Sequence, residues 1–292
     1  MKPKIVVSLI TAEQEFQAFQ AKDARDTGAR LDLDVEVLFA ENNPITQIQQ
    51  LFHFIHMSES ERPAAILVET VSGDGLERAA RNAVKAGMGW MLLNRDVPYV
   101  EALRREHPDL AIGTVQTDQE EVGRIQARQM LALLPIGGFV LYIQGPADTS
   151  VMKERLRGTT EAIAGAPIQL RIATGDWTEG GGEKSAATWL RLRTSGGSGV
   201  DLVAAQNDSM AIGARRVILS SHPEWTHVRF IGCDGLSNGG RKAVDERILS
   251  ATITTPSNAG PALEMVSKWL RTGAVPPMTK LLTPRPYPQS LR

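Results

Sequence analysis

Short apolar runs alternate with longer amphipathic stretches along the whole chain, and this alternation constrains the fold more than any other feature. Compact runs rich in β-branched residues, typical of parallel strands covered on both faces, occur at Ile5–Ser8, Leu33–Leu38, Ala65–Val68, Trp90–Leu93, Leu110–Gly113, Phe139–Ile143, Leu202–Ala205, Val228–Ile231 and Ala251–Ile253. Helical patterns lie between them, at Ile45–His56, Leu76–Ala86, Glu121–Leu134, Met210–Leu219 and Ala262–Leu270. Repeated βα units predict doubly wound parallel sheets with right-handed crossovers.

The number of strands predicts two lobes. About ten strands suit two sheets of five or six strands better than one sheet, and a chain of 292 residues suits two domains. The first βα series ends near Val115–Asp118, where no Pro/Gly/Ser-rich linker is found. We therefore expect two closely packed α/β lobes joined by short crossing segments. Two glycine-containing loops, Thr194–Gly199 and Gly180–Gly182, are candidates for flexibility.

Composition excludes some classes of protein. Hydrophobic residues are 42% and charged residues 22% of the chain, which is enough for sizeable buried cores. The formal net charge is -1 and no long basic run occurs. A nucleic-acid surface therefore has little support, although a small basic patch could still form in the fold. The single cysteine, Cys233, excludes an intrachain disulfide and leaves the redox compartment open.

Membrane insertion is not expected, because no apolar run is long enough to span a bilayer. The first residues carry two lysines but no apolar stretch of signal-peptide length. We expect a periplasmic or extracellular location if a signal peptide has been removed, and a cytoplasmic location otherwise.

Polar side chains follow most of the expected strands. Ligands of open α/β sheets bind outside the carboxyl ends of the strands, and the residues there are Ser8, Thr11, Glu69, Thr70, Asn94, Arg95, Gln144, Gln206, Asn207, Asp208, Asp234, Thr254 and Thr255. Such residues can also be helix N-caps, but a capping role does not explain Arg95 and explains Glu69 less well. Together these positions predict the lining of a polar cleft.

Arg95 and Asp234 have the clearest chemical logic for a ligand. A guanidinium offers forked donors and a carboxylate forked acceptors, which suit the vicinal hydroxyls of a sugar or polyol, and Asn207 can add an amide. The alternatives are a salt bridge from Arg95 to Asp96 or Glu69, and an Asp-Gly turn at Asp234.

Several motifs, in order along residues 4–272, resemble those of the ribose-type periplasmic binding proteins, a type 1 family related to the effector domains of LacI-type regulators. Their sequences are Glu41-Asn42-Asn43-Pro44, Leu93-Asn94-Arg95, the segment from Asp148 to Arg155, the segment Q-N-D-S-M-A-I-G-A from Gln206 to Ala214, Ile231-Gly232-Cys233-Asp234-Gly235, and Leu249-Ser250-Ala251-Thr252-Ile253.

The resemblance implies two Rossmann-like lobes joined by a three-segment hinge, with a sugar buried by hinge closure. The expected lobes are residues 1–117 with 255–280, and residues 118–254 with 281–292. The implied hydroxyl binders are Arg95, Arg155, Asn207 and Asp234. Other positions implied to line the site are Asn94 (in place of an aspartate), Glu69 (in place of an asparagine), Thr255 (in place of a glutamine), Ser8, and the aromatic residues Trp177 and Phe16, which alternatively pack in the core.

The chain departs from the family pattern in ways that bear on the ligand. The segment Thr11–Phe16 replaces an aromatic-containing turn, Asn94 removes a charge and Glu69 introduces one. A hydrogen-bonding site rejects a wrong arrangement of hydroxyls strongly, because its buried polar groups would be left unpaired. The ligand therefore need not be ribose.

No catalytic residue, metal site or cofactor is predicted. Gly180–Gly182 lacks the pattern of a phosphate-binding loop and reads as a helix entry capped by Thr178. His53 and His56 lack a third ligand, and Cys233 has no histidine placed to activate it, which favours a packed thiol.

The sequence thus predicts a monomeric solute-binding protein that presents a sugar or polyol to an ABC transporter permease or a receptor. The alternatives are the effector domain of a LacI-type regulator without its DNA-binding part, a cytosolic sugar sensor, and, less favoured, an enzyme. The chain begins directly with its first expected strand, which counts against DNA binding by this polypeptide.

Overall fold

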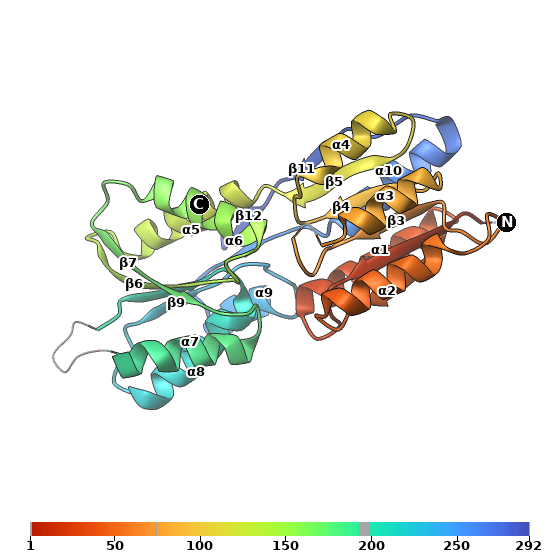
Figure 1. Ribbon diagram of the computed structural model, residues 1–292. Helices are drawn as coiled ribbons and strands as arrows, with labels where there is room; N and C mark the ends of the chain where they lie inside the picture. The colour runs from red at the N-terminus through yellow and green to blue at the C-terminus, as the bar shows by residue number, and fades with distance from the viewer. Residues whose placement is uncertain (1, 74, 193–198, 292) are drawn as a thin grey trace. The chain divides into compact units, whose positions relative to one another are not determined.

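The computed structural model describes residues 2–73, 75–192 and 199–291, so most of the expected loop Thr194–Gly199 lies outside the described residues. The chain divides into two compact units (Figure 1). Met1–Thr117 and Ser257–Leu282 form the first lobe, and Asp118–Pro256 and Thr283–Arg292 form the second.

The first lobe is built on a six-stranded parallel sheet with the order β11-β5-β4-β3-β1-β2. Its strands are β1 (Lys4–Leu9), β2 (Asp34–Phe39), β3 (Ala65–Val68), β4 (Gly89–Leu93), β5 (Ile112–Thr117) and β11 (Thr279–Leu282). Its helices are α1 (Glu15–Arg30), α2 (Pro44–Ile55), α3 (Glu77–Lys85), α4 (Tyr99–Glu106) and α10 (Ala259–Thr272).

Both faces of this sheet are buried, which explains why its central strands are apolar throughout. One core contains Trp90, Leu92 and side chains of α2, α3 and α4. The other contains Met91, Leu93 and side chains of α1 and α10. The sheet therefore has helices on both sides, and its strands point their carboxyl ends to one edge.

The second lobe contains a four-stranded parallel sheet with the order β7-β6-β8-β9. Its strands are β6 (Gly138–Gln144), β7 (Ile168–Thr174), β8 (Leu202–Ala205) and β9 (Arg229–Ile231). Strand β10 (Thr252–Thr254) pairs antiparallel with β12 (Arg285–Tyr287) and joins the β9 side through single parallel bridges. Its helices are α5 (Gln119–Leu133), α6 (Ser150–Ala162), α7 (Glu179–Leu192), α8 (Asp208–Ser221), α9 (Gly240–Asp245) and the short 3₁₀ helix Gln289–Leu291.

The predicted fold class, two doubly wound α/β lobes, is confirmed, and each expected strand run corresponds to a strand. Strands β7, β11 and β12 were not predicted. Strand β7 lies at a sheet edge and alternates between exposed and half-buried residues, so it lacks a continuous apolar run.

The last two crossings between the lobes lie two residues later than expected. The amide of Thr255 donates to the carbonyl of Asp234 (3.1 Å), which holds residues up to 255 beside the second lobe's strands. Leu282 still pairs with Thr117 of β5, so β11 completes the first sheet before the chain leaves it.

Glycines allow two helices of the second lobe to pack closely. An added Cβ at Gly182 of α7 would lie 2.2 Å from the carbonyl oxygen of Met210, and one at Gly213 of α8 would lie 2.1 Å from that of Glu179. The expectation that Gly180–Gly182 forms a flexible loop is therefore wrong, because these residues lie in the first turn of α7, where Gly182 packs on α8. The alternative expectation of a helix entry is confirmed, since the Thr178 hydroxyl accepts from the Gly181 amide (2.9 Å).

We expect Gly213→Ala to lower the free energy of unfolding by about 1–3 kcal/mol, because the methyl group must force two helices apart. Gly180→Ala is the matched control, since its Cβ would meet only the Thr178 hydroxyl at 3.9 Å, and alanine there should leave stability unchanged or raise it by up to about 1 kcal/mol. Urea unfolding of both variants measures the difference. Equal stabilities would contradict the close packing of α7 and α8.

Candidate ligand-binding residues at the strand ends

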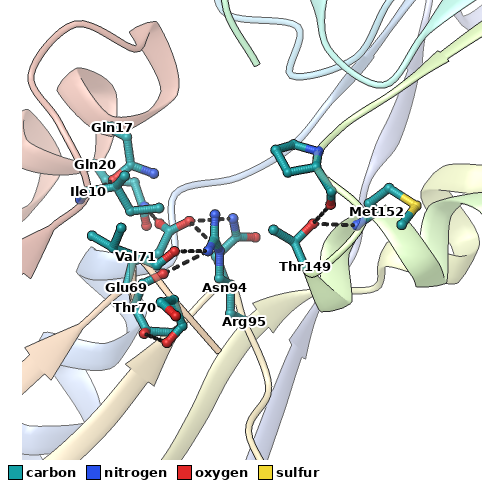
Figure 2. Close-up of polar contacts among 12 residues, drawn as sticks. Ile10, Gln17, Gln20, Glu69, Thr70, Val71, Asn94, Arg95, Thr149 and Met152 are labelled. Atoms are coloured by element: carbon teal, nitrogen blue, oxygen red, sulfur yellow. Dashed lines mark hydrogen bonds and ion pairs between the residues drawn. The ribbon is translucent and has the colours of Figure 1, made fainter. Parts of the chain in front are cut away.

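A buried carboxylate organises the carboxyl ends of β3 and β4 in the first lobe. Glu69 follows β3 and is 2% exposed. One carboxylate oxygen accepts from the Gln20 amide (2.6 Å), and the other accepts from the Asn94 amide (3.0 Å) and lies 3.8 Å from Nε of Arg95 (Figure 2). The two amide donors come from separate segments, α1 and the end of β4, so the charge introduced by Glu69 has partners inside its own lobe.

Arg95 extends from the end of β4 across the loop that follows β3. Its Nη1 donates to the carbonyl oxygens of Thr70 (2.8 Å) and Val71 (3.2 Å), and its side chain is 11% exposed (Figure 2). The preceding residue, Asn94, has φ 60°, a left-handed conformation that asparagine tolerates better than most residues. The anticipated contact of Arg95 with Glu69 is thus present, and it fixes the guanidinium rather than leaving it mobile.

Ser8 is linked to the backbone of Glu69 through the side chain of Gln47. It is fully buried in β1, and its hydroxyl accepts from the Gln47 amide (3.1 Å). The same Gln47 amide donates to the carbonyl of Glu69 (2.9 Å), while its Oε1 accepts from the Val71 amide (2.9 Å). In this arrangement Ser8 and Gln47 support the loop after β3.

Phe16, the other predicted site residue of this lobe, is half-buried in the first turn of α1. Its ring lies 6.2 Å from that of Phe19 with a tilt of 55°. Two aromatic faces therefore stand near the start of α1, after the first strand.

A second buried cationic group lies at the carboxyl ends of the strands in the second lobe. Arg155, in the first turns of α6, has a side chain that is 5% exposed. Its Nε donates to Gln119 (2.7 Å), its Nη1 donates to the carbonyl of Gln206, and its Nη2 lies 3.7 Å from a carboxylate oxygen of Asp234. Each lobe therefore contains its own arginine–carboxylate contact.

Asp234 follows β9 in an unusual backbone conformation, with φ 100°. Its amide donates to Ile253 (2.9 Å) and its carbonyl accepts from Thr255 (3.1 Å). The buried Asp208 carboxylate accepts from the next amide, that of Gly235 (2.8 Å). A strained residue held by several partners is typical of functional positions. The side chain of Asp234 is 16% exposed, so one carboxylate edge can be reached.

Trp177 is held in a conformation that bulky residues seldom adopt, with φ 72°. The Asn207 amide donates to its carbonyl (2.8 Å), while Asn207 Oδ1 caps α8 by accepting from the Met210 amide (3.0 Å). Arg155 lies 5.9 Å from the indole ring. A Cβ at Gly145 would lie 1.9 Å from the ring, so only glycine fits there. The alternative roles expected for these residues are therefore present: Asn207 caps a helix, and Trp177 packs against the core.

Four buried glutamines hold these groups in place, and of these the sequence had indicated only Gln206. Gln20, Gln47, Gln119 and Gln206 are all 1% exposed or less. Gln206 receives the Gly145 amide (3.0 Å) and donates to Tyr142 and Met152 (3.1 Å each). Gln206 was visible within the motif after β8, whereas Gln20 and Gln119 occur in helices with no local signal.

The thiol of Cys233 is not placed for catalysis. It is fully buried, and burial raises its pKa far above that of an ordinary thiol. The prediction of a packed thiol is confirmed.

The described residues include neither a cluster suited to a metal ion nor a helix suited to a membrane. No group of three or more His, Cys, Asp or Glu side chains there could hold a metal ion. No described helix is both long and apolar enough to cross a membrane.

Comparison with known proteins places the chain in a family. Residues 5–263 match the family described as "Periplasmic binding protein domain", and the chain belongs to it. The predicted ribose-type membership of this family is confirmed.

Several curated proteins of this family are similar in sequence. A xylitol-binding protein of Mycolicibacterium smegmatis is 28% identical over 224 residues, which cover 75% of this chain. The match spans only 59% of that relative's own length. The galactofuranose-binding protein YtfQ of Escherichia coli is 23% identical over 275 residues, covering 92% of this chain and 82% of YtfQ.

Solved structures show the same fold. The periplasmic binding protein of the arabinose ABC transporter from Shewanella sp. ANA-3 superposes with a TM-score of 0.87 at 18% identity, over 98% of this chain and 92% of that one. A galactofuranose-binding protein superposes with a TM-score of 0.85 at 22% identity, over 99% and 95% of the two chains.

We expect Glu69→Gln to lower the free energy of unfolding by about 1–3 kcal/mol, because an amide nitrogen would then face a donor of Gln20 or Asn94 and leave buried groups unpaired. Glu36→Gln is the control, since the Glu36 side chain is 43% exposed and its carboxylate pairs with Lys4 (2.9 Å); the loss of this ion pair should cost no more than about 1 kcal/mol. Chemical denaturation measures both, and a Glu69→Gln protein as stable as the control would show that the carboxylate is not the anchor.

Cys233 should react with a disulfide reagent at pH 8 at least a hundredfold more slowly in the folded protein than in urea. The reactive thiolate is disfavoured because burial raises the thiol pKa. Absorbance of the released chromophore gives both rates. Fast labelling of the folded protein would mean that the thiol is accessible.

Proposed function

We propose that this protein binds a neutral sugar or polyol with the polar groups at the carboxyl ends of its two sheets, and releases it unchanged to a transporter. The observation that supports the proposal is that each lobe holds an arginine beside a carboxylate at these strand ends, Arg95 with Glu69 and Arg155 with Asp234. Donors and acceptors of both kinds suit a ligand that offers many hydroxyl groups.

The ligand is a neutral molecule in this proposal. The guanidinium of Arg95 already donates to two carbonyl oxygens and faces Glu69, and that of Arg155 faces Asp234. An anionic ligand would compete with these carboxylates, whereas hydroxyl groups can donate to the carboxylates and accept from the arginines at once. The indole of Trp177 offers a face for the C–H groups of a sugar ring.

The relatives support this class of ligand. Their names refer to xylitol, galactofuranose and ribose, all of which are uncharged polyhydroxy compounds. The replacement of the family's usual residues by Glu69 and Asn94 favours a ligand other than ribose, because a changed set of buried donors and acceptors selects a different arrangement of hydroxyls.

The proposed mechanism is hinge closure. Ligand held by one lobe recruits the polar groups of the other, and the closed form is favoured only by the extra contacts that it gains. Closure would present a surface to an ABC transporter permease or a receptor, with the protein acting as a periplasmic monomer. A regulator's effector domain remains a less favoured alternative, as does an enzyme.

Thermal-shift screening against neutral pentoses, hexoses, polyols and their phosphorylated forms should identify a neutral ligand that raises the unfolding temperature, because binding to the folded state stabilises it by mass action. Arg95→Gln and Asp234→Asn should each weaken binding of that ligand at least tenfold in calorimetry, since each leaves buried groups unpaired.

Arg81→Gln is the matched control for this experiment. Arg81 is on the surface of α3 and pairs with Glu77 and Glu106, so its loss should change affinity by less than twofold. Normal affinity in both strand-end variants would rule out these residues as ligand contacts. Conversion of the ligand into another compound would favour an enzyme.

A further inference from the structure

A recess in the second lobe gathers three arginines at the end of the sheet opposite to the candidate ligand residues. Its cavity volume is about 330 Å³. Its lining includes Arg215, Arg229, Arg247, Val228, Phe230 and Ser250. These residues lie around the amino end of β9, whereas Asp234 follows its carboxyl end.

Three separate elements bring the arginines to the recess. Arg215 lies on α8, one turn before Leu219. Arg229 is the first residue of β9. Arg247 follows α9 with φ 60°, in a turn closed by hydrogen bonds from its amide to Val244 (3.0 Å) and from the Ile248 amide to Ala243 (2.8 Å).

The charges of these arginines are not compensated by the lining, which contains no aspartate or glutamate. Among the described residues, none of the three forms an ion pair with a carboxylate. The neighbouring Arg216 differs, because it pairs with Glu179 and Glu183 of α7. Of two adjacent arginines on α8, Arg216 is therefore paired with carboxylates, whereas Arg215 lines the recess without such a pair in the described part of the chain.

The floor and rim of the recess suit a small anion. Val228 and Phe230 are 6% and 3% exposed, and they give the recess an apolar base that excludes water from one side. Thr226 and Ser250 add hydroxyl groups to the lining. The volume lies at the small end of the range for small-molecule sites, roughly 300–1,000 Å³.

We propose that this recess binds an oxyanion of the phosphate or sulfate type, either free or as a small organic ester. Guanidinium groups offer paired, coplanar N–H donors that match the oxygens of such anions, and three of them concentrate positive charge where no acidic side chain lines the cavity. The recess shares no residue with the groups assigned to the sugar and lies at the other end of β9, so neither proposal depends on the other.

The test titrates inorganic phosphate, sulfate and methyl phosphate into the full chain at constant ionic strength set with sodium chloride. Calorimetry should show saturable binding, and the amide resonances of Phe230 and Ser250 should shift in NMR spectra. The double variant Arg229→Gln/Arg247→Gln should weaken binding at least tenfold. Tighter binding of methyl phosphate than of inorganic phosphate would indicate an organic ester, and equal binding would indicate recognition of the phosphate group alone.

Arg216→Gln is the matched control, because it removes one charge from the same helix outside the recess. It should alter phosphate affinity by less than twofold. Arg215→Lys keeps the charge but loses the forked donors, so it should weaken binding by an intermediate factor, and it also serves if the double variant fails to fold. Absence of saturable binding, or an equal loss in Arg216→Gln and the recess variants, would overturn the proposal.

Discussion

A carboxylate that leaves water on folding must gain hydrogen-bond donors in exchange, and this requirement shapes the polar end of the first lobe. Glu69 is 2% exposed, accepts hydrogen bonds from the amides of Gln20 and Asn94, and lies 3.8 Å from the Arg95 guanidinium. Because these donors belong to different segments, the ends of β3 and β4 and the middle of α1 are tied together. The same group that could attract a ligand therefore fixes the shape of the surface that would meet it.

The second lobe uses a cation for the same purpose. Arg155 is buried and contacts Gln119, Gln206 and Asp234, which links α5, β8 and β9. Asp234 and Trp177 adopt strained backbones beside it, and the strain is opposed by hydrogen bonds from neighbouring elements. A preorganised site of this type loses little free energy to rearrangement when hydroxyl groups replace water.

The fold could be predicted largely because parallel strands buried on both faces leave a continuous apolar run in the sequence. Ala65–Val68 and Leu202–Ala205 were found at the same bounds as β3 and β8. Strand β7 was missed since an edge strand has no such constraint, and β11 and β12 are short segments beyond the last helix of the βα series. Helix α1 was missed because its buried face includes Gln17, Gln20, Thr27 and Gly28, which give no apolar stripe.

The positions of the candidate site residues could be predicted, but their contacts could not. The motifs placed Asn94 and Arg95 at the strand ends of the first sheet, and Asn207 and Asp234 at those of the second, because ligand residues of parallel sheets follow the strands. The partner of each charged side chain, however, can come from residues far away in the sequence. The Arg95–Glu69 contact had been only an alternative, and Gln20, 49 residues from Glu69, had no signal of its own.

The net charge of the chain hides an asymmetry within the second lobe. At the carboxyl ends of its strands, the Arg155 guanidinium faces a carboxylate, whereas the recess at the amino end of β9 has three arginines and no acid in its lining. A chain with 32 basic and 33 acidic side chains gives no indication of this difference, since composition averages over both ends. A bound ligand responds mainly to charges within about one Debye length, roughly 8–10 Å at physiological ionic strength. The proposals of a neutral polyol at one end of the sheet and an anion at the other therefore rest on the local balance of charge at each end, and not on the total.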